Sequence, residues 1–221
     1  KVVRDDKASL SFDGDGDKVV VSDNATLSYT TDMSYSYWLK APKSQVDGNP
    51  RVFSKGINYY NYWVTGGGLE VRFYDGGTVA ECTIPNVFDD KWHLITVVHD
   101  ITNDKLLAYK DGVFIASDMD TSNVTYDDID NNTDLYIAEA NYGGQNLVGN
   151  MKEVRMWGKA LTANDVAELY KGNVPSDMVL ELLVNEGAGA TVNDTVGSND
   201  GTITNAVWSS DTPWCSSRKC Y

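Results

Sequence analysis

The chain has 221 residues, of which 42% are hydrophobic and 11% aromatic, and its formal net charge is −14. This composition is sufficient for a sizeable apolar core and differs from that of disordered chains. The acidic balance argues against nucleic acid or an anionic membrane surface as partner, because phosphate binding needs a basic footprint. It suits calcium, a neutral or cationic ligand, or solubility. No apolar run approaches the ~18 residues of a membrane span.

Alternation of apolar and polar residues with period two runs through most of the chain. It is clear in residues 33–41 (MSYSYWLKA), 69–74 (LEVRFY) and 92–100 (WHLITVVHD). Within 105–117, the pair Asp111-Gly112 separates two apolar runs. This pair is a strong hairpin signal, because a type I′ turn needs positive φ at both positions. Together these features predict an all-β fold, a two-sheet antiparallel sandwich.

One short helix is predicted near 163–171. Thr162 is a suitable N-cap and Asp165 lies three residues later, near the positive end of the helix dipole. Gly172 favours a left-handed C-terminus, and Pro175 prevents the helix from resuming. The apolar stripe consists of Val166, Leu169 and Tyr170. We expect this helix to pack on an edge or an end of the sandwich.

Four blocks of sequence carry a family resemblance: ASLSFDGDGDKVVV, MSYSYWLKAP, VFDDKWHLITVVHDITNDKLLAYKDGVFIAS and TDLYIAEANYGGQNLVGNMKEVRMWGKALTANDVAELYKG. Their order and spacing, from Ala8 to Gly172, resemble those of LamG-like jellyroll (laminin G type 3) domains of the concanavalin A-like lectin/glucanase superfamily. The resemblance implies a jelly roll of two curved antiparallel sheets. It also implies binding of glycans, proteins or cell surfaces, often within a larger extracellular protein.

The segment LELLVNEGAGATVNDTVGSNDGTITNAVW also resembles a piece of this family, but one that usually precedes the FDG block. Either the domain is circularly permuted, or the segment opens a second domain of a tandem array. We expect permutation, because these strands would cover otherwise open sheet edges. The predicted organisation is a single domain over 1–211, with 173–211 completing the sandwich, followed by a tail over 212–221.

The turn FDGDGD raises the question of calcium. Counted from Asp13, an EF-hand loop needs Gly and Glu where this chain has Lys18 and Asn24, so it is not an EF-hand. Related jellyrolls often hold a structural calcium where this turn meets the strand NMKEVRMW. Two readings remain: structural Ca²⁺, or a metal-free turn in which Lys152 pairs with an aspartate. The metal reading uses Asp13, Asp15, Asp17 and Glu153. A second acidic loop, 125–134, is more typical of a solvated loop.

Catalytic signatures are weak. The sequence has no run of paired carboxylates of the kind that retaining glycosidases use, no nucleophile elbow and no phosphate loop. The two histidines, His93 and His99, read as structural. The prediction is that the protein is not an enzyme.

Ligand binding is a better fit, because sugar recognition uses aromatic faces and planar polar side chains at a concave site. The segments GINYYNYWVTGGG and AEANYGGQN are rich in tyrosine, asparagine and glycine. Strand alternation places Tyr60 and Tyr62 on one face, and Tyr59 and Trp63 on the other. The predicted ligand-binding residues are Tyr60, Tyr62, Arg72, Tyr142 and Gln145.

The cysteines give an indication of the cellular compartment in which the protein works. A bridge between Cys215 and Cys220 in the tail would favour an extracellular setting, whereas Cys82 reads as a buried, inert thiol. We therefore predict a non-catalytic extracellular carbohydrate-binding or adhesion module with a glycan or cell-surface ligand, within a larger chain or assembly. The alternatives are a structural or decoration module of a viral or bacterial surface assembly, and a polysaccharide-active enzyme.

Overall fold

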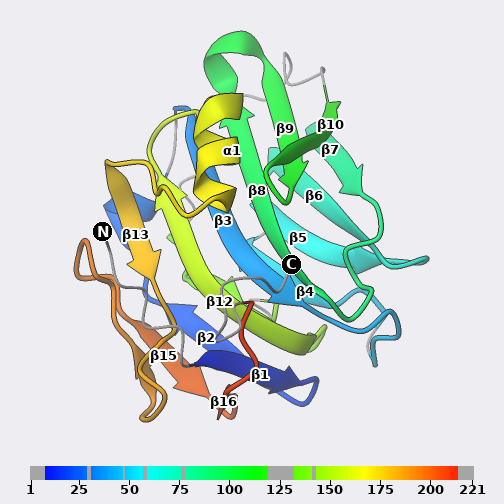
Figure 1. Cartoon of the computed structure of the whole chain (residues 1–221), viewed down its shortest axis with the longest axis vertical. Helices are drawn as coiled ribbons and strands as arrows, with labels where there is room; N and C mark the ends of the chain where they lie inside the picture. Colours follow the sequence, from blue (N-terminus) through cyan, green and yellow to red (C-terminus); the bar gives the residue numbers. More distant parts are fainter. Residues whose placement is uncertain are drawn as a thin grey trace.

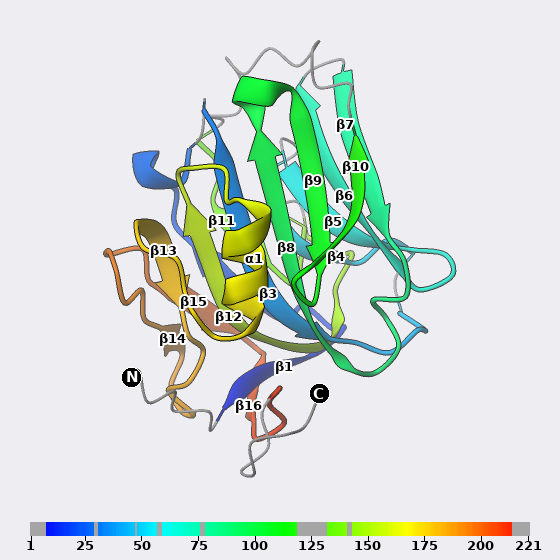
Figure 2. The same cartoon turned by 45° about the horizontal axis from the view of Figure 1, so that its top comes forward.

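The computed structural model describes residues 8–28, 31–46, 48–56, 59–75, 78–118, 132–140 and 143–213. These residues form two antiparallel eight-stranded sheets packed face to face (Figures 1 and 2). The all-β jelly-roll prediction is thus confirmed.

Sheet A has the strand order β10 (Val113–Asp118), β9 (Lys105–Lys110), β8 (Trp92–Asp100), β3 (Met33–Lys40), β12 (Val148–Trp157), β1 (Ser9–Asp13), β16 (Val207–Ser209), with β13 (Met178–Leu182) also paired to β12. Sheet B has the order β14 (Thr191–Val192), β15 (Gly201–Thr204), β2 (Lys18–Val21), β11 (Leu135–Ile137), β4 (Arg51–Lys55), β5 (Tyr59–Val64), β6 (Gly68–Asp75), β7 (Thr78–Ile84). Short 3₁₀ turns occur at Ala25–Leu27 and Ile101–Asn103.

The core between the sheets follows from the alternation along each strand. Tyr35 and Tyr37 of β3 point inward and are fully buried. The Tyr35 ring stacks on Phe53 of β4 at a centroid distance of 4.6 Å. Asn61 of β5 links the two sheets, because its amide nitrogen donates to Tyr35 Oη at 2.8 Å and its amide oxygen accepts from Tyr37 Oη at 2.8 Å. The tyrosine hydroxyls therefore keep hydrogen-bond partners inside the apolar core.

Helix α1 (Ala163–Tyr170) begins with the predicted N-cap. Thr162 accepts from the backbone N–H of Asp165, whose carboxylate accepts from the Thr162 N–H, a capping box. The helix does not pack on an edge or end of the sandwich as expected. It covers the outer face of sheet A (Figure 1), where Val166 and Leu169 join a second apolar cluster with Trp38 and Trp157. Ser34 and Ser36 on the outer face of β3 are small and Trp38 is apolar, so this part of the strand can accept a helix.

The strands beyond Pro175 lie in this sandwich. β13 pairs with the second half of β12, β15 with β2 and β16 with β1. Strand β12 bonds β1 over Val148–Met151 and β13 over Val154–Trp157. A register shift separates the halves, and Glu153 there has φ 52°. Such a bulge bends the strand so that one strand serves two neighbours on the same side. The domain boundaries themselves stay a prediction.

Two further sequence predictions concern the cysteines and membrane-spanning segments. Cys82 is a free, buried cysteine, as predicted, and burial raises the pKa of its thiol to about 12. The cysteines Cys215 and Cys220 lie outside the described residues. Within the described part of the chain, no helix has the length and apolarity of a membrane span.

Candidate functional site

The outer face of sheet B carries two rows of polar and aromatic side chains, set by strand register. In one row, Ser54 lies opposite Tyr60, Tyr60 opposite Arg72, and Arg72 opposite Glu81. In the next row, Arg51 lies opposite Tyr62, and Tyr62 opposite Glu70. Residues directly opposite on neighbouring antiparallel strands share a face and touch. We call the set Arg51, Tyr60, Tyr62, Glu70, Arg72, Glu81 and Gln145 the sheet B patch.

Arg51 covers the two tyrosines. Its guanidinium carbon lies 3.7 Å from the Tyr60 ring centroid and 4.9 Å from that of Tyr62, and the two ring centroids are 5.7 Å apart. Tyr60 is only 9% exposed. The tyrosine rings are therefore part of a cation–π stack and do not offer open faces to a sugar ring.

Arg72 holds the centre of the patch. Its Nη2 donates to Glu70 Oε1 at 2.7 Å and to Glu81 Oε2 at 2.6 Å, and its Nη1 donates to Tyr60 Oη at 3.4 Å. Tyr62 Oη donates to the same Glu70 carboxylate. Burial, together with the hydrogen bond to Glu70, raises the pKa of Tyr62, so the phenol stays a neutral donor.

Two donors of the patch have no acceptor among the described residues. They are Arg51 Nη1 and Arg72 Nε, both of which are buried at the atomic level. Buried polar atoms in proteins nearly always have partners, and an unmade hydrogen bond costs free energy. Both atoms lie below the surface of the patch, so the exposed part of each guanidinium, and not these buried N–H groups, is what a ligand could reach.

Four of the predicted ligand-binding residues meet in this patch: Tyr60, Tyr62, Arg72 and Gln145. Gln145 precedes β12, and its side-chain Oε1 accepts from Arg51 Nε at 3.1 Å while its backbone carbonyl accepts from the Arg51 N–H at 2.8 Å. The fifth, Tyr142, lies outside the described residues. The role of all five in ligand binding stays a prediction.

Sequence reasoning missed Arg51, which connects these residues. The segments 51–55 and 59–64 flank a short connection and form a hairpin, but regular counting outward from it pairs Arg51 with Trp63, on the opposite face. A register shift between Arg51 and Phe53 places Arg51 opposite Tyr62 instead, and no local sequence signal predicts that shift. The carboxylates of Glu70 and Glu81 were missed for the same reason. Cross-strand register decides which side chains on one face of the sheet become neighbours.

The acidic turn between β1 and β2 is held by its own side chains. Asp17 Oδ2 accepts from the Asp13 N–H at 2.7 Å, and Asp13 Oδ1 accepts from the Asp15 N–H at 2.9 Å. Burial, followed by the nearby carboxylates, raises the pKa of Asp17. Among the described residues, no group of three or more His, Cys, Asp or Glu side chains is arranged to hold a metal ion. Calcium at Asp13, Asp15 and Asp17 stays a prediction.

Glu153 and Lys152 lie away from this turn. The β1–β12 register places Leu10 opposite Met151 and Asp13 opposite Val148, so residues 152 and 153 fall at and just past the end of β1 that is farther from the turn. Glu153 pairs with Arg155 at 2.8 Å, and Lys152 Nζ donates to the Ala8 carbonyl at 2.6 Å. The expected pairing of Lys152 with Asp13 or Asp17 is wrong. The register between β1 and β12 places Lys152 and these aspartates at opposite ends of β1.

The second acidic loop lies mostly outside the described residues, which resume at Asn132. Asp134 is described, and its Oδ1 accepts from the Asp23 N–H at 2.8 Å. It thus connects the loop to the end of β2.

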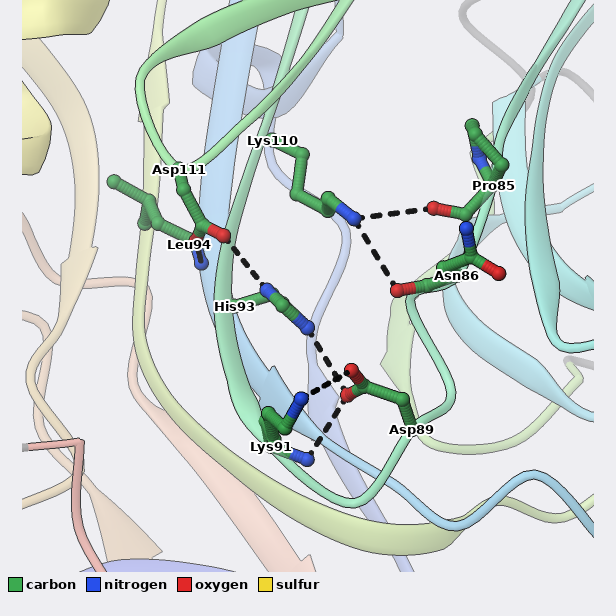
Figure 3. Close-up of polar contacts among 8 residues, drawn as sticks. All are labelled: Pro85, Asn86, Asp89, Lys91, His93, Leu94, Lys110 and Asp111. Atoms are coloured by element: carbon green, nitrogen blue, oxygen red, sulfur yellow. Dashed lines mark hydrogen bonds and ion pairs between the residues drawn. The ribbon is translucent and has the colours of Figure 1, made fainter. Parts of the chain in front are cut away.

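His93 bridges two carboxylates (Figure 3). Its Nδ1 lies 2.7 Å from Asp111 Oδ2 and its Nε2 lies 3.1 Å from Asp89 Oδ1. Asp111 also accepts from the Leu94 N–H at 2.9 Å. Burial alone would lower the pKa of His93, but the two carboxylates outweigh it and raise that pKa. The imidazole thus joins β8, the β9–β10 turn and the loop before β8.

His99 has the opposite environment. It is fully buried, with its ring centroid 4.1 Å from that of Phe73. Burial lowers its pKa to about 4, so the imidazole is neutral near neutral pH. Its position between the sheets gives it a packing role.

Two stacked antiparallel sheets with a helix on one outer face define the class of jelly-roll lectin-like sandwiches. Residues 13–167 match the family Laminin G 3, described as the concanavalin A-like lectin/glucanases superfamily, and the chain belongs to this family. No curated protein matches the sequence.

Solved structures with the same fold have low sequence identity. A candidate carbohydrate-binding protein from Bacteroides ovatus superposes with a TM-score of 0.72 at 18% identity, covering 92% of this chain and 60% of that protein. The binding domain of Paraclostridial Mosquitocidal Protein 1 gives 0.55 at 17% identity, covering 70% and 41%. A heptameric SAP-like pentraxin from Limulus polyphemus gives 0.56 at 14% identity, covering 78% and 86%. The chain thus spans 60% or less of the length of the first two.

Proposed function

We propose that the protein is a non-catalytic, extracellular carbohydrate-binding module and that the sheet B patch is its glycan site. The observation that carries the proposal is the convergence of Arg51 and Arg72 beside the carboxylates of Glu70 and Glu81 on the outer face of sheet B. The family and a candidate carbohydrate-binding neighbour support this class of ligand.

The chemistry of the patch suits sugar hydroxyls. A hydroxyl accepts from one group and donates to another, so it fits a surface where arginine donors lie next to glutamate acceptors. The Glu70 carboxylate lies 2.7 Å from Arg72 Nη2, which places both kinds of group within one sugar ring's reach. Two arginines and two glutamates also balance in charge, which favours a neutral glycan over a charged one.

The patch recognises by planar hydrogen bonding more than by stacking. Because Arg51 already lies over the Tyr60 and Tyr62 rings, a sugar would contact the guanidinium edge and the tyrosine hydroxyls. Arginine is suited to this role, since its donors are fixed in one plane.

A broad glycan array, followed by calorimetry with the best neutral glycan, tests the proposal. Arg72→Lys and Arg51→Lys each keep the charge but remove the planar guanidinium and its fixed set of donors. Each should weaken binding by about tenfold or more. Phe114→Ala, at a 51% exposed side chain on β10, is the control and should bind as the native protein does. Unchanged affinity in both arginine variants, with native circular dichroism, would overturn the assignment.

A further inference from the structure

A cavity of about 310 Å³ lies on the opposite side of the molecule from the sheet B patch, beside α1 on the outer face of sheet A. Its walls come from β3, β8, the loop before β8, the β9–β10 turn, the end of α1 and the segment after β16. It is lined by Trp38, Lys40, Asp90, Lys91, Trp92, His93, Asp111, Tyr170, Thr212 and Pro213. The volume is at the small end of the ~300–1,000 Å³ typical of small-molecule sites.

One wall depends on a glycine. The Tyr170 ring lies against Trp38, with centroids 5.9 Å apart. Gly112, in the turn that precedes β10, approaches so closely that a Cβ built on it would lie 2.9 Å from Tyr170 Cβ. Its φ of 77° is also a conformation that favours glycine. The hairpin turn therefore fixes the last turn of α1, and with it the Tyr170 ring, beside the cavity.

A second wall is fixed by Asp211. Its Oδ1 accepts from Trp92 Nε1 at 2.9 Å and its Oδ2 accepts from Lys40 Nζ at 2.7 Å. Lys40 and Trp92 lie directly opposite each other on β3 and β8. The carboxylate thus sets the orientation of the Trp92 indole and brings Pro213 to the mouth of the cavity. The arrangement is pre-formed, which lowers the entropy lost on binding.

The three basic groups of the cavity each have an acidic partner, and Asp90 adds one further carboxylate to the lining. Lys40 pairs with Asp211 at 2.7 Å, Lys91 with Asp89 at 3.4 Å, and His93 with Asp111 at 2.7 Å (Figure 3). An anionic ligand would gain little, because each basic group already has an acidic partner and Asp90 adds negative charge. A neutral ligand with many hydroxyls would find donors and acceptors at the rim, and aromatic and proline surface for its C–H faces.

We propose that this cavity is a second binding site, for a neutral saccharide unit the size of a mono- or disaccharide, with Trp92 and Tyr170 as the stacking surfaces. It differs from the sheet B patch in mechanism, because its aromatic rings line an open cavity, whereas those of the patch lie under Arg51. It stands whether or not the patch binds glycan.

The test is a ¹H–¹⁵N NMR titration of the full chain with neutral methyl glycosides of glucose, galactose, mannose and xylose and their β-linked disaccharides, at millimolar concentration. The indole N–H signal of Trp92, assigned from Trp92→Phe, should shift with at least one of these probes. Trp92→Ala and, as a second variant that keeps the helix packed, Tyr170→Leu should each weaken that binding by about tenfold or more. The Phe114→Ala control should bind as the native chain does.

The outcomes separate the two sites. Loss of the Trp92 shift in Tyr170→Leu, with the shift retained in Arg72→Lys, supports the cavity. A shift that disappears only in Arg72→Lys supports the patch and overturns the cavity assignment. Absence of any shift at Trp92 with all the neutral probes also overturns it.

Discussion

Acidification from pH 6.5 to about 4 is expected to destabilise the native state through the buried imidazole of His99. Burial lowers the pKa of this histidine from 6.5 to about 4. The unfolded chain therefore binds a proton in this window that the native chain does not, and stability falls as the pH falls. Each unit of pKa difference is worth about 1.4 kcal/mol, so the contribution lost by pH 4 is about 3 kcal/mol.

Urea denaturation of the native chain and of His99→Gln at a series of pH values measures this contribution. Other groups titrate in both proteins, so the useful quantity is the difference in unfolding free energy between them. The native protein's advantage should shrink by about 3 kcal/mol between pH 6.5 and 4. A difference that does not change with pH would refute the reasoning, since it would mean that His99 titrates alike in both states.

His93 provides an internal comparison, because the chain has only two histidines. Burial lowers its pKa, but Asp111 and Asp89 outweigh burial and raise it above 6.5. Its contribution is thus fully present below pH 6.5 and is lost as the pH rises through the folded-state pKa. An NMR titration should show one imidazole that titrates above 6.5 and one that titrates near 4. Two imidazoles that both titrate near 6.5 would contradict both assignments.

Two further predictions concern stability, measured by urea denaturation. Arg155 lies buried between Glu153 and Glu181, at 2.8 Å from each. Arg155→Ala leaves these carboxylates uncompensated and should lower the free energy of unfolding by about 3–5 kcal/mol. A loss below about 1 kcal/mol would show that the two ion pairs are solvated. At Gly149 an added Cβ would lie 2.6 Å from the Lys40 carbonyl oxygen, so Gly149→Ala must displace the β3–β12 pair. It should lower the melting temperature by several degrees, and an unchanged value would contradict the close approach.

Local sequence signals predicted the elements well where one strand or helix decides the outcome. The alternation in β3 correctly placed Tyr35 and Tyr37 in the core, and the capping box at Thr162 fixed the start of α1. Asp111-Gly112 gave the β9–β10 turn, in which both residues have positive φ. These signals are local, because they depend on side-chain period and on backbone conformations within a few residues.

Features that depend on pairing between distant segments could not be read in this way. The β1–β12 register separates Glu153 from Asp13, and no local pattern encodes a register across that separation. The placement of α1 over Trp38 has the same origin, since a short amphipathic helix fits any apolar face. The cavity near Trp92 needed Asp211, far away along the chain.

The candidate site could be predicted from the sequence only in part. Alternation put Tyr60 and Tyr62 on one face, which the structure confirms and shows to be the outer face of sheet B. It did not show that Arg51 lies over their rings, and this changes the predicted recognition from stacking to hydrogen bonding. The residue types were visible in the sequence, whereas the contacts among them follow from strand register.

The central claim is that the sheet B patch binds a neutral glycan. Its most direct test is the arginine side-chain Nε–H spectrum of the ¹⁵N-labelled protein, titrated with the best neutral glycan from the array. The Arg72 guanidinium lies at the centre of the patch and is partly exposed, so a hydroxyl bound to it should shift its Nε–H signal in proportion to occupancy. A saturable shift at Arg72 is expected, with a midpoint equal to the calorimetric Kd. Saturation of the glycan with the Arg51 and Arg72 signals unmoved would contradict it.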